Sequence, residues 1–102
     1  MYTTVEIIDY LMKNPLSANI LGILMNKGMS DPELMTQLKI DKSTLDEAIR
    51  GLSKYGLVYH GYRRKGRGVQ IRNTMTPIGR KIFPLYEDAK REGKVIEQPS
   101  VV

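Results

Sequence analysis

The sequence predicts a single, mostly helical α+β domain, and three observations lead to this fold class. The chain has 102 residues, which is the size of one domain. Apolar residues recur at the spacing of amphipathic helices before residue 56 and again after residue 76. Between these regions the spacing changes to the alternation of two β-strands around a basic turn that contains glycine.

Composition excludes several classes of protein. Hydrophobic residues make up 41% of the chain, enough for one modest core. The absence of cysteine excludes disulfide scaffolds and thiolate metal sites. No apolar run has the length of a membrane span, and residues 1–4 do not resemble a signal peptide. We therefore expect a cytoplasmic protein with no membrane partner and no cofactor.

Two helices are predicted at the start of the chain. The first spans residues 3–14, and its apolar face is formed by Val5, Ile8 and Met12, with Ile7 and Leu11 beside them. Pro15 ends it, because the residue before a proline is disfavoured in the helical conformation. The second begins at Pro15 or Ser17 and reaches about Lys27, with an apolar stripe of Leu16, Ile20, Ile23 and Leu24.

Two further helices follow with a very short connection. Ser30 and Glu33 have the spacing of a capping box, which starts a third helix that ends near residues 39–40. The fourth helix, residues 41–55, is capped by Asp41 or Ser43 and ends at Gly56, and its inward face carries Leu45, Ile49 and Leu52. Helices joined this tightly must cross steeply, as in a helix-turn-helix.

Residues 57–62 and 69–75 are predicted to form the two strands of a hairpin. Val69, Ile71 and Met75 share the face expected to pack on the helices, while Gln70, Arg72 and Thr74 face away. Gly66 and Gly68 permit the backbone conformation of the turn.

The final predicted helix spans residues 77–92. Thr76 and Pro77 begin it, and its apolar stripe consists of Ile78, Ile82, Leu85, Tyr86 and Ala89. Pro84 conflicts with a helix interior, so we expect a kink between Arg80 and Pro84 or a break into two helices. The folded domain is expected to comprise residues 1–93, with residues 94–102 as a flexible tail.

Positive charge is concentrated in the centre of the chain. Residues 41–82 contain ten Lys and Arg against three acids, a net charge of +7, whereas residues 1–40 and 83–102 each carry −1. A basic region between nearly neutral flanks is typical of a protein that binds a polyanion.

The polar face of helix 41–55 provides the first group of candidate nucleic-acid contacts, because its side chains can bond base edges or phosphates. These candidates are Lys42, Ser43, Thr44, Glu47, Arg50 and Lys54. An ordinary solvated helix face is the alternative. Phosphates repel Asp46 and Glu47, so we expect these carboxylates to pair with Arg50 within the helix rather than to accept from cytosine.

The hairpin tip provides the second group. Five cations fall within ten residues, and no acid lies between Gly61 and Tyr86. Because neighbouring like charges repel, packing does not explain such a cluster, whereas contact with phosphates or the minor groove does. The candidates are Arg63, Arg64, Lys65, Arg67 and Arg72.

Nothing in the sequence predicts an enzyme or a metal site. His60 is the only histidine, and no neighbouring residue gives it the spacing of a metal ligand or a general base. Nucleophile elbows, phosphate-binding glycine loops and zinc-binding HExxH motifs are all absent from the sequence.

Three segments in this order resemble the winged-helix DNA-binding fold, over about residues 15–83. Residues 29–38 resemble the first helix of its helix-turn-helix, and residues 41–58 resemble the recognition helix running into the first wing strand. Residues 75–80 are similar to the segment that follows the wing in regulators of the multiple-antibiotic-resistance (MarR) type and in small archaeal winged-helix regulators.

The resemblance implies a homodimeric, sequence-specific transcriptional regulator of double-stranded DNA. Helix 41–55 would enter the major groove, and the wing, residues 61–72, would contact the backbone or minor groove. The flanking helices 3–14 and 77–92 would form the dimer, because a small core is not expected to cover both of their apolar stripes. The expected interface consists of Val5, Ile8, Met12, Ile78, Ile82, Leu85, Tyr86 and Ala89.

Two other functions remain open at this stage. The chain could be an architectural or chromatin protein that binds DNA without reading its sequence, or an interaction module whose basic patch binds an acidic protein. The operator sequence, the direction of regulation and any small-molecule effector are also open.

Overall fold

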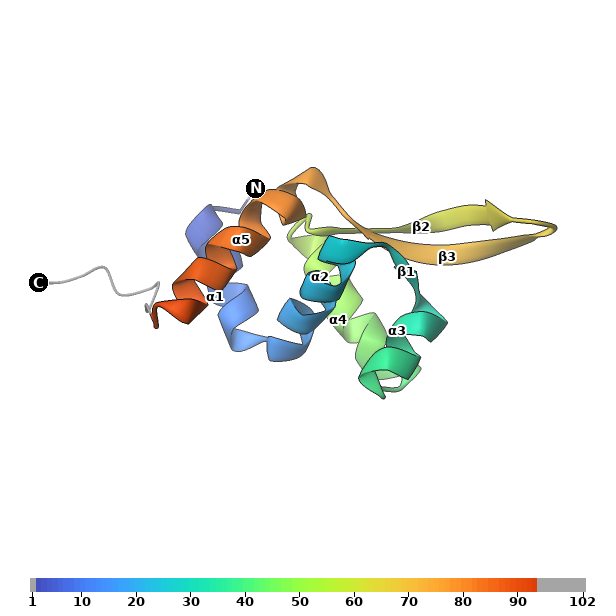
Figure 1. Ribbon diagram of the computed structural model, residues 1–102, viewed down its shortest axis with the longest axis horizontal. Coiled ribbons are helices and arrows are strands. Elements are labelled where there is room, and N and C mark those ends of the chain that lie inside the picture. Colours follow the sequence, from blue (N-terminus) through green and yellow to red (C-terminus); the bar gives the residue numbers. More distant parts are fainter. Residues whose placement is uncertain (1, 94–102) are drawn as a thin grey trace, which may run out of the picture.

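The computed structural model describes residues 2–93, and only the backbone of Arg63, Arg64, Lys65 and Gln70. The predicted tail, residues 94–102, lies outside the described residues. Five helices and a three-stranded antiparallel sheet make up the described chain (Figure 1), which confirms the predicted α+β class. In order, the elements are α1 (Thr4–Lys13), α2 (Pro15–Asn26), β1 (Met29–Ser30), α3 (Asp31–Leu38), α4 (Lys42–Lys54), β2 (Val58–Lys65), β3 (Gly68–Met75) and α5 (Pro77–Arg91).

Side-chain caps determine where several helices begin. Ser30 and Glu33 form the predicted capping box, in which the Ser30 N–H donates to Glu33 Oε1 at 2.8 Å. Hydrogen bonds from the Ser30 backbone and side chain lower the pKa of Glu33. Asp41 caps α4 by accepting from the Thr44 N–H at 2.9 Å, and Gly56 follows the helix with a φ of 73°.

The sheet differs from the prediction in two ways. The two-residue strand β1 pairs with β3, opposite Arg72 and Asn73, and was not predicted because two residues carry no periodicity. The hairpin strands also continue further than expected, with Lys65 opposite Gly68 and only Gly66 and Arg67 in the turn. Gly66 has a φ of 60°, as the first position of a type II′ turn requires. Most of the basic run is therefore strand rather than loop.

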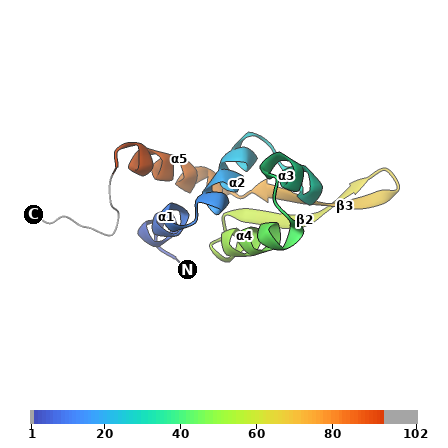
Figure 2. The same ribbon diagram turned by 90° about the horizontal axis from the view of Figure 1, so that it is seen from below.

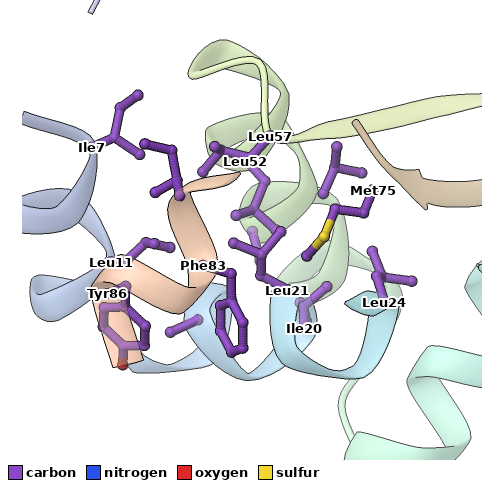
Figure 3. Packing of buried hydrophobic residues seen from close by; sticks show 14 of the residues in the cluster. Ile7, Leu11, Ile20, Leu21, Leu24, Leu52, Leu57, Met75, Phe83 and Tyr86 are labelled. Carbon is purple, nitrogen blue, oxygen red and sulfur yellow. The ribbon is translucent and has the colours of Figure 1, made fainter. Parts of the chain in front are cut away.

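One hydrophobic core joins the helices to the base of the hairpin (Figure 3). Leu21 and Leu24 of α2 lie at its centre with Leu52 of α4 and the connecting residue Leu57. The core-facing side of α1 is turned from the predicted one, because Ile7, Ile8 and Leu11 are buried while Val5 is 52% exposed. Leu21, which lies outside the predicted stripe of α2, is also fully buried.

The terminal helices pack against each other within one chain, at the end of the molecule opposite the hairpin (Figure 2). This corrects the premise that a single core could not cover both apolar stripes. Four residues expected to face a second copy are buried in the chain's own core: Ile8, Ile82, Tyr86 and Ala89. Met12 is partly buried against the same core.

Pro84 lies inside α5, which is one continuous helix from Pro77 to Arg91. The predicted alternative of a break into two helices is therefore wrong. Buried residues occur on both sides of the proline, with Ile82 and Phe83 before it and Tyr86 and Ala89 after it. This burial favours continuing the helix and offsets the hydrogen bond that a proline cannot donate.

The start of α5 is held closely against the start of the hairpin. Thr76 caps α5 by accepting from the Gly79 N–H at 3.0 Å, and its hydroxyl donates to the Gly56 carbonyl at 2.6 Å. The Thr76 N–H donates to the Leu57 carbonyl, and a Cβ on Gly79 would overlap that same carbonyl oxygen. Only glycine therefore fits at position 79.

We expect Gly79→Ala to destabilise the protein by about 2 kcal/mol, because the added methyl group must displace backbone. The sign is diagnostic, since alanine normally stabilises a helix relative to glycine by up to about 1 kcal/mol. Urea unfolding would measure the change, with Arg80→Ala at the adjacent exposed position as the control. An increase in the free energy of unfolding of Gly79→Ala would contradict the close approach.

Candidate nucleic-acid interface

Helix α4 presents a fully polar outer face. Leu45, Ala48, Ile49 and Leu52 are buried, so at 100° per residue the side chains furthest from the core are Ser43, Glu47, Arg50 and Lys54. All four are exposed. The structure therefore brings together four of the six predicted contact residues of this helix on one strip.

Thr44 lies to one side of this strip, toward the start of the chain. Thr44 and Glu47 line a groove of about 460 Å³ together with the connection between α1 and α2, including Lys13, Asn14 and Ser17. Tyr10 also lines this groove, and its hydroxyl bonds to Ser17 while its ring stacks on Tyr55 with the centroids 4.5 Å apart. Thr44 is exposed, but it belongs to the edge of the polar strip rather than its centre.

Lys42 and Asp46 lie on the other side, toward the hairpin. The Lys42 ammonium bonds to Asp46 Oδ1 at 3.0 Å and to Asp31 Oδ2 at 3.2 Å. Both carboxylates raise the pKa of Lys42, and the hydrogen bond to Asp46 has the larger effect. Asp46 therefore pairs with Lys42, and among the described ion pairs none joins Arg50 to Asp46 or Glu47, contrary to the expectation for this face.

The hairpin of β2 and β3 extends away from the helices beside α3 and α4 (Figure 1). Its outer end carries four of the predicted cations: Arg63, Arg64 and Lys65 on β2, and the exposed Arg67 in the turn. The exposed tyrosines Tyr59 and Tyr62 lie nearer its base on opposite faces of the strand. We use the term wing for this hairpin, Val58–Met75.

The Arg72 side chain contacts two residues outside the wing. Its Nη2 donates to the Gly28 carbonyl at 2.7 Å, and its Nη1 lies 3.9 Å from Glu33 Oε1. The guanidinium thus joins β3 to the segment that leads into α3. The Arg72 side chain is therefore bound within the protein itself.

Asn73 joins the wing to the helix-turn-helix and was missed by the sequence analysis. Its side chain is fully buried, although its neighbours on the same face of β3, Ile71 and Met75, are apolar. Its Nδ2 donates to the Met29 carbonyl at 3.1 Å and to Asp31 Oδ1 at 2.8 Å. A polar residue at an apolar position of an alternating strand was the available signal.

His60 completes this junction from the opposite strand. Both protons of the Asn73 amide nitrogen are donated to other groups, and the amide Oδ1 lies against His60 Nδ1. Since an amide oxygen can only accept, His60 Nδ1 must be the nitrogen that carries the proton. His60 Nδ1 is 4.0 Å from Asp31 Oδ1. We name Asp31, His60 and Asn73 the polar junction, because they connect α3, β2 and β3.

The part of the chain that the structure describes contains neither a cluster of metal ligands nor a membrane-spanning helix. Among residues 2–93, no group of three His, Asp or Glu side chains could hold a metal ion. No helix in the same range is long and apolar enough to cross a membrane.

Comparison with known proteins identifies the fold. No protein-family model and no curated protein sequence matches the chain. Among solved structures, the transcriptional regulator BldR from Sulfolobus solfataricus is similar, with a TM-score of 0.70 and 20% identity over 86% of this chain. The adhesin competence repressor AdcR from Streptococcus pyogenes is similar over 82% of the chain, with a TM-score of 0.62 and 16% identity. The chain has the winged-helix fold.

The chain covers different shares of the structures that it resembles. The chain spans 53% of a mutant ZitR from Lactococcus lactis, which it matches with a TM-score of 0.66 and 14% identity, and 66% of BldR. It spans 96% of the circadian clock associated protein Pex from Anabaena, with a TM-score of 0.58 and 18% identity. The winged-helix unit is thus the part that these proteins share.

The polar junction leads to a prediction for Asn73→Asp. The substitution keeps the acceptor for His60 but replaces the donor 2.8 Å from Asp31 with a second carboxylate oxygen. Two buried carboxylates this close raise the pKa of one of them, which costs stability above the ordinary carboxyl pKa. We expect a loss on the order of 3 kcal/mol at pH 7 that shrinks as the pH falls and the pair takes up a proton.

Urea unfolding of Asn73→Asp and the wild type at pH 7 and pH 4 would measure this difference. The control is Asn19→Asp, the same chemical change at an exposed position of α2. A loss that is equal at both pH values would show that the repulsion between the two carboxylates is not its cause.

Proposed function

We propose that this protein is a transcriptional regulator that binds double-stranded DNA. The observation that carries the proposal is the placement of the exposed polar face of α4 beside a wing whose outer end is strongly cationic. In addition, the similar structures BldR and AdcR are described as a transcriptional regulator and a repressor.

Helix α4 is the element proposed to read bases in the major groove. Its outer strip combines Arg50 and Lys54, which donate hydrogen bonds, with Ser43, which can donate and accept. Arginine and lysine bond the O6 and N7 atoms of guanine, and Glu47 can accept from the amino group of cytosine. Thr44 lies at the edge of the strip, so we propose that it contacts the sugar-phosphate backbone of DNA beside the groove.

The wing is proposed to bind phosphates or the minor groove through Arg63, Arg64, Lys65 and Arg67. Its long strands place these residues well beyond the helices, so they can reach DNA next to the groove that α4 occupies. Contacts of this kind supply affinity without sequence information. Arg72 is left out of the contact set because its guanidinium binds Gly28 and faces Glu33.

A second candidate function is an architectural DNA-binding protein. It is favoured by the distribution of charge, because four cations lie on the wing while a carboxylate, Glu47, occupies the middle of the α4 strip. A protein of this kind would bind all duplexes with similar affinity, whereas a specific regulator prefers its site by roughly 10³ or more.

A homodimer is the proposed assembly. The support is now a smaller set of residues than the sequence predicted: Val5 of α1 and Ile78 and Leu85 of α5, which are 52%, 51% and 46% exposed. The two helices that carry them pack together, so a two-fold axis near them would bury all three in an isologous contact. Such a dimer would set two α4 helices about 34 Å apart along DNA.

The proposal that α4 reads bases is tested by comparing a substitution in α4 with substitutions in the wing. Duplexes selected from a random library would supply the best site, and fluorescence anisotropy would give affinities for it and for random duplex. We expect Arg50→Ala to weaken the best site by about 1–3 kcal/mol while affecting random duplex much less. The matched control is Arg64→Ala with Lys65→Ala, which should weaken both duplexes equally and lower the salt slope by about one per lost contact.

A uniform loss from Arg50→Ala would assign α4 to the backbone and support the architectural function. The absence of duplex binding by the wild type at low salt would reject both DNA-binding functions in favour of a protein-interaction module.

The test of the dimer is Leu85→Asp. We expect the wild type to have about twice the 11.6 kDa mass of one chain in light scattering at micromolar concentration, and the variant to have the mass of one chain. Lys90→Ala, which changes the net charge equally at another exposed position of α5, should remain dimeric. A wild type with the mass of one chain would contradict the proposed assembly.

A further inference from the structure

Lys42 is the first residue of α4, at the end of the helix that meets the proposed groove. A cation is unfavourable there, because the N-terminus of a helix carries partial positive charge. Its ammonium has two carboxylate partners that come from different elements, Asp46 one turn along the same helix and Asp31 at the start of α3. We call Lys42, Asp31 and Asp46 the lysine cage.

The two carboxylates of the cage are held to different degrees. The Asp31 side chain is 8% exposed, and its other oxygen accepts a hydrogen bond from the buried Asn73, so it cannot turn away from Lys42. The Asp46 side chain is 44% exposed, and every described bond of its carboxylate is to Lys42. Asp46 can therefore release Lys42 by a change of rotamer, while Asp31 stays bonded to the lysine ammonium.

The cage also prevents Lys42 from contributing to nonspecific electrostatic binding of DNA. One ammonium and two carboxylates leave a local charge of −1, at the wing side of the strip formed by Ser43, Glu47, Arg50 and Lys54. A phosphate of a non-matching duplex therefore meets an ammonium that is already paired, with a carboxylate beside it. On a matching duplex, the other contacts already hold a DNA acceptor close to Lys42. That acceptor can compete with Asp46 for the ammonium, because little further conformational entropy is lost when it binds.

From this arrangement we infer that Asp46 is a specificity-determining residue that reserves Lys42 for a correctly positioned acceptor. On a matching duplex Lys42 exchanges Asp46 for a phosphate or guanine acceptor, and on other duplexes it stays in the cage. The inference rests on the proposed function, and it assigns to a carboxylate of the reading helix a role in suppressing binding to the wrong sequence.

The test is a double-mutant cycle between Asp46→Ala and Lys42→Ala on the full chain. With Lys42 present, Asp46→Ala should tighten binding to random duplex roughly tenfold at 0.1 M salt and raise the salt slope by about one, as one additional phosphate contact does. Binding to the selected site should change much less, so the preference for that site falls. In the Lys42→Ala background, the same substitution should change neither quantity.

Asp88→Ala is the matched control. Asp88 forms an ion pair with Arg91 on α5, so the change removes the same charge and a pair within one helix, away from the α4 strip. It should leave the preference for the selected site unchanged. Thermal melts would establish that all variants are folded, and Asp46 suits the experiment because it is not buried.

Two results would overturn the inference while leaving the proposed function intact. One is unchanged binding of Asp46→Ala to random duplex. The other is an equal gain with and without Lys42, which would mean that Asp46 acts only by repelling phosphates. Failure of the wild type to bind any duplex would instead remove the proposed function, and the inference with it.

Discussion

A buried amide joins the wing of this protein to its helix-turn-helix. Asn73 lies in the wing, but its hydrogen bonds go to the Met29 carbonyl, to Asp31 at the start of α3 and to His60 on the neighbouring strand. Because an unsatisfied polar group in a core is costly, these partners must stay in register with one another. Together with the pairing of β1 and β3, this fully buried side chain fixes how the wing meets the helix-turn-helix.

The same junction shapes the electrostatics of the proposed DNA-binding face. Asp31 is shared between Asn73 and Lys42, so the contact that locates the wing also locates the first cation of α4. Arg72 is likewise drawn into the protein by Gly28. Lys42 and Arg72 thus have partners within the protein, so not all of the net charge of +7 over residues 41–82 is available to phosphates. We propose that affinity resides mainly in the wing and selectivity in α4.

The helices at the two ends of the chain complete the core before any partner is present. Their buried residues face α2 and each other, and the close approach of Gly79 to Leu57 fixes the start of α5 beside the base of the wing. Any dimer would therefore be built from a narrow row of exposed apolar side chains, not from the broad stripes that helical periodicity reveals. Such a contact would connect directly to the wing through α5.

Local features of the sequence were enough to locate most elements. The capping box of α3, the glycine after α4 and the spacing of Leu45, Ile49 and Leu52 act between residues a few positions apart, so the sequence shows them directly. Cation clustering likewise identified the wing, although its strands proved longer than predicted.

Long-range contacts were decided only in the tertiary structure. The pairing of β1 with β3, the bonds of Asn73 to Met29 and Asp31, and the bond of Lys42 to Asp31 each join residues more than ten positions apart. Helical periodicity identified an apolar stripe on α5, but it could not tell whether that stripe meets the same chain or another copy. The sequence alone thus determined the elements and their charge, because these depend on neighbours along the chain. Packing decided which polar groups remain available for binding, because a side chain's partners depend on what the fold brings beside it.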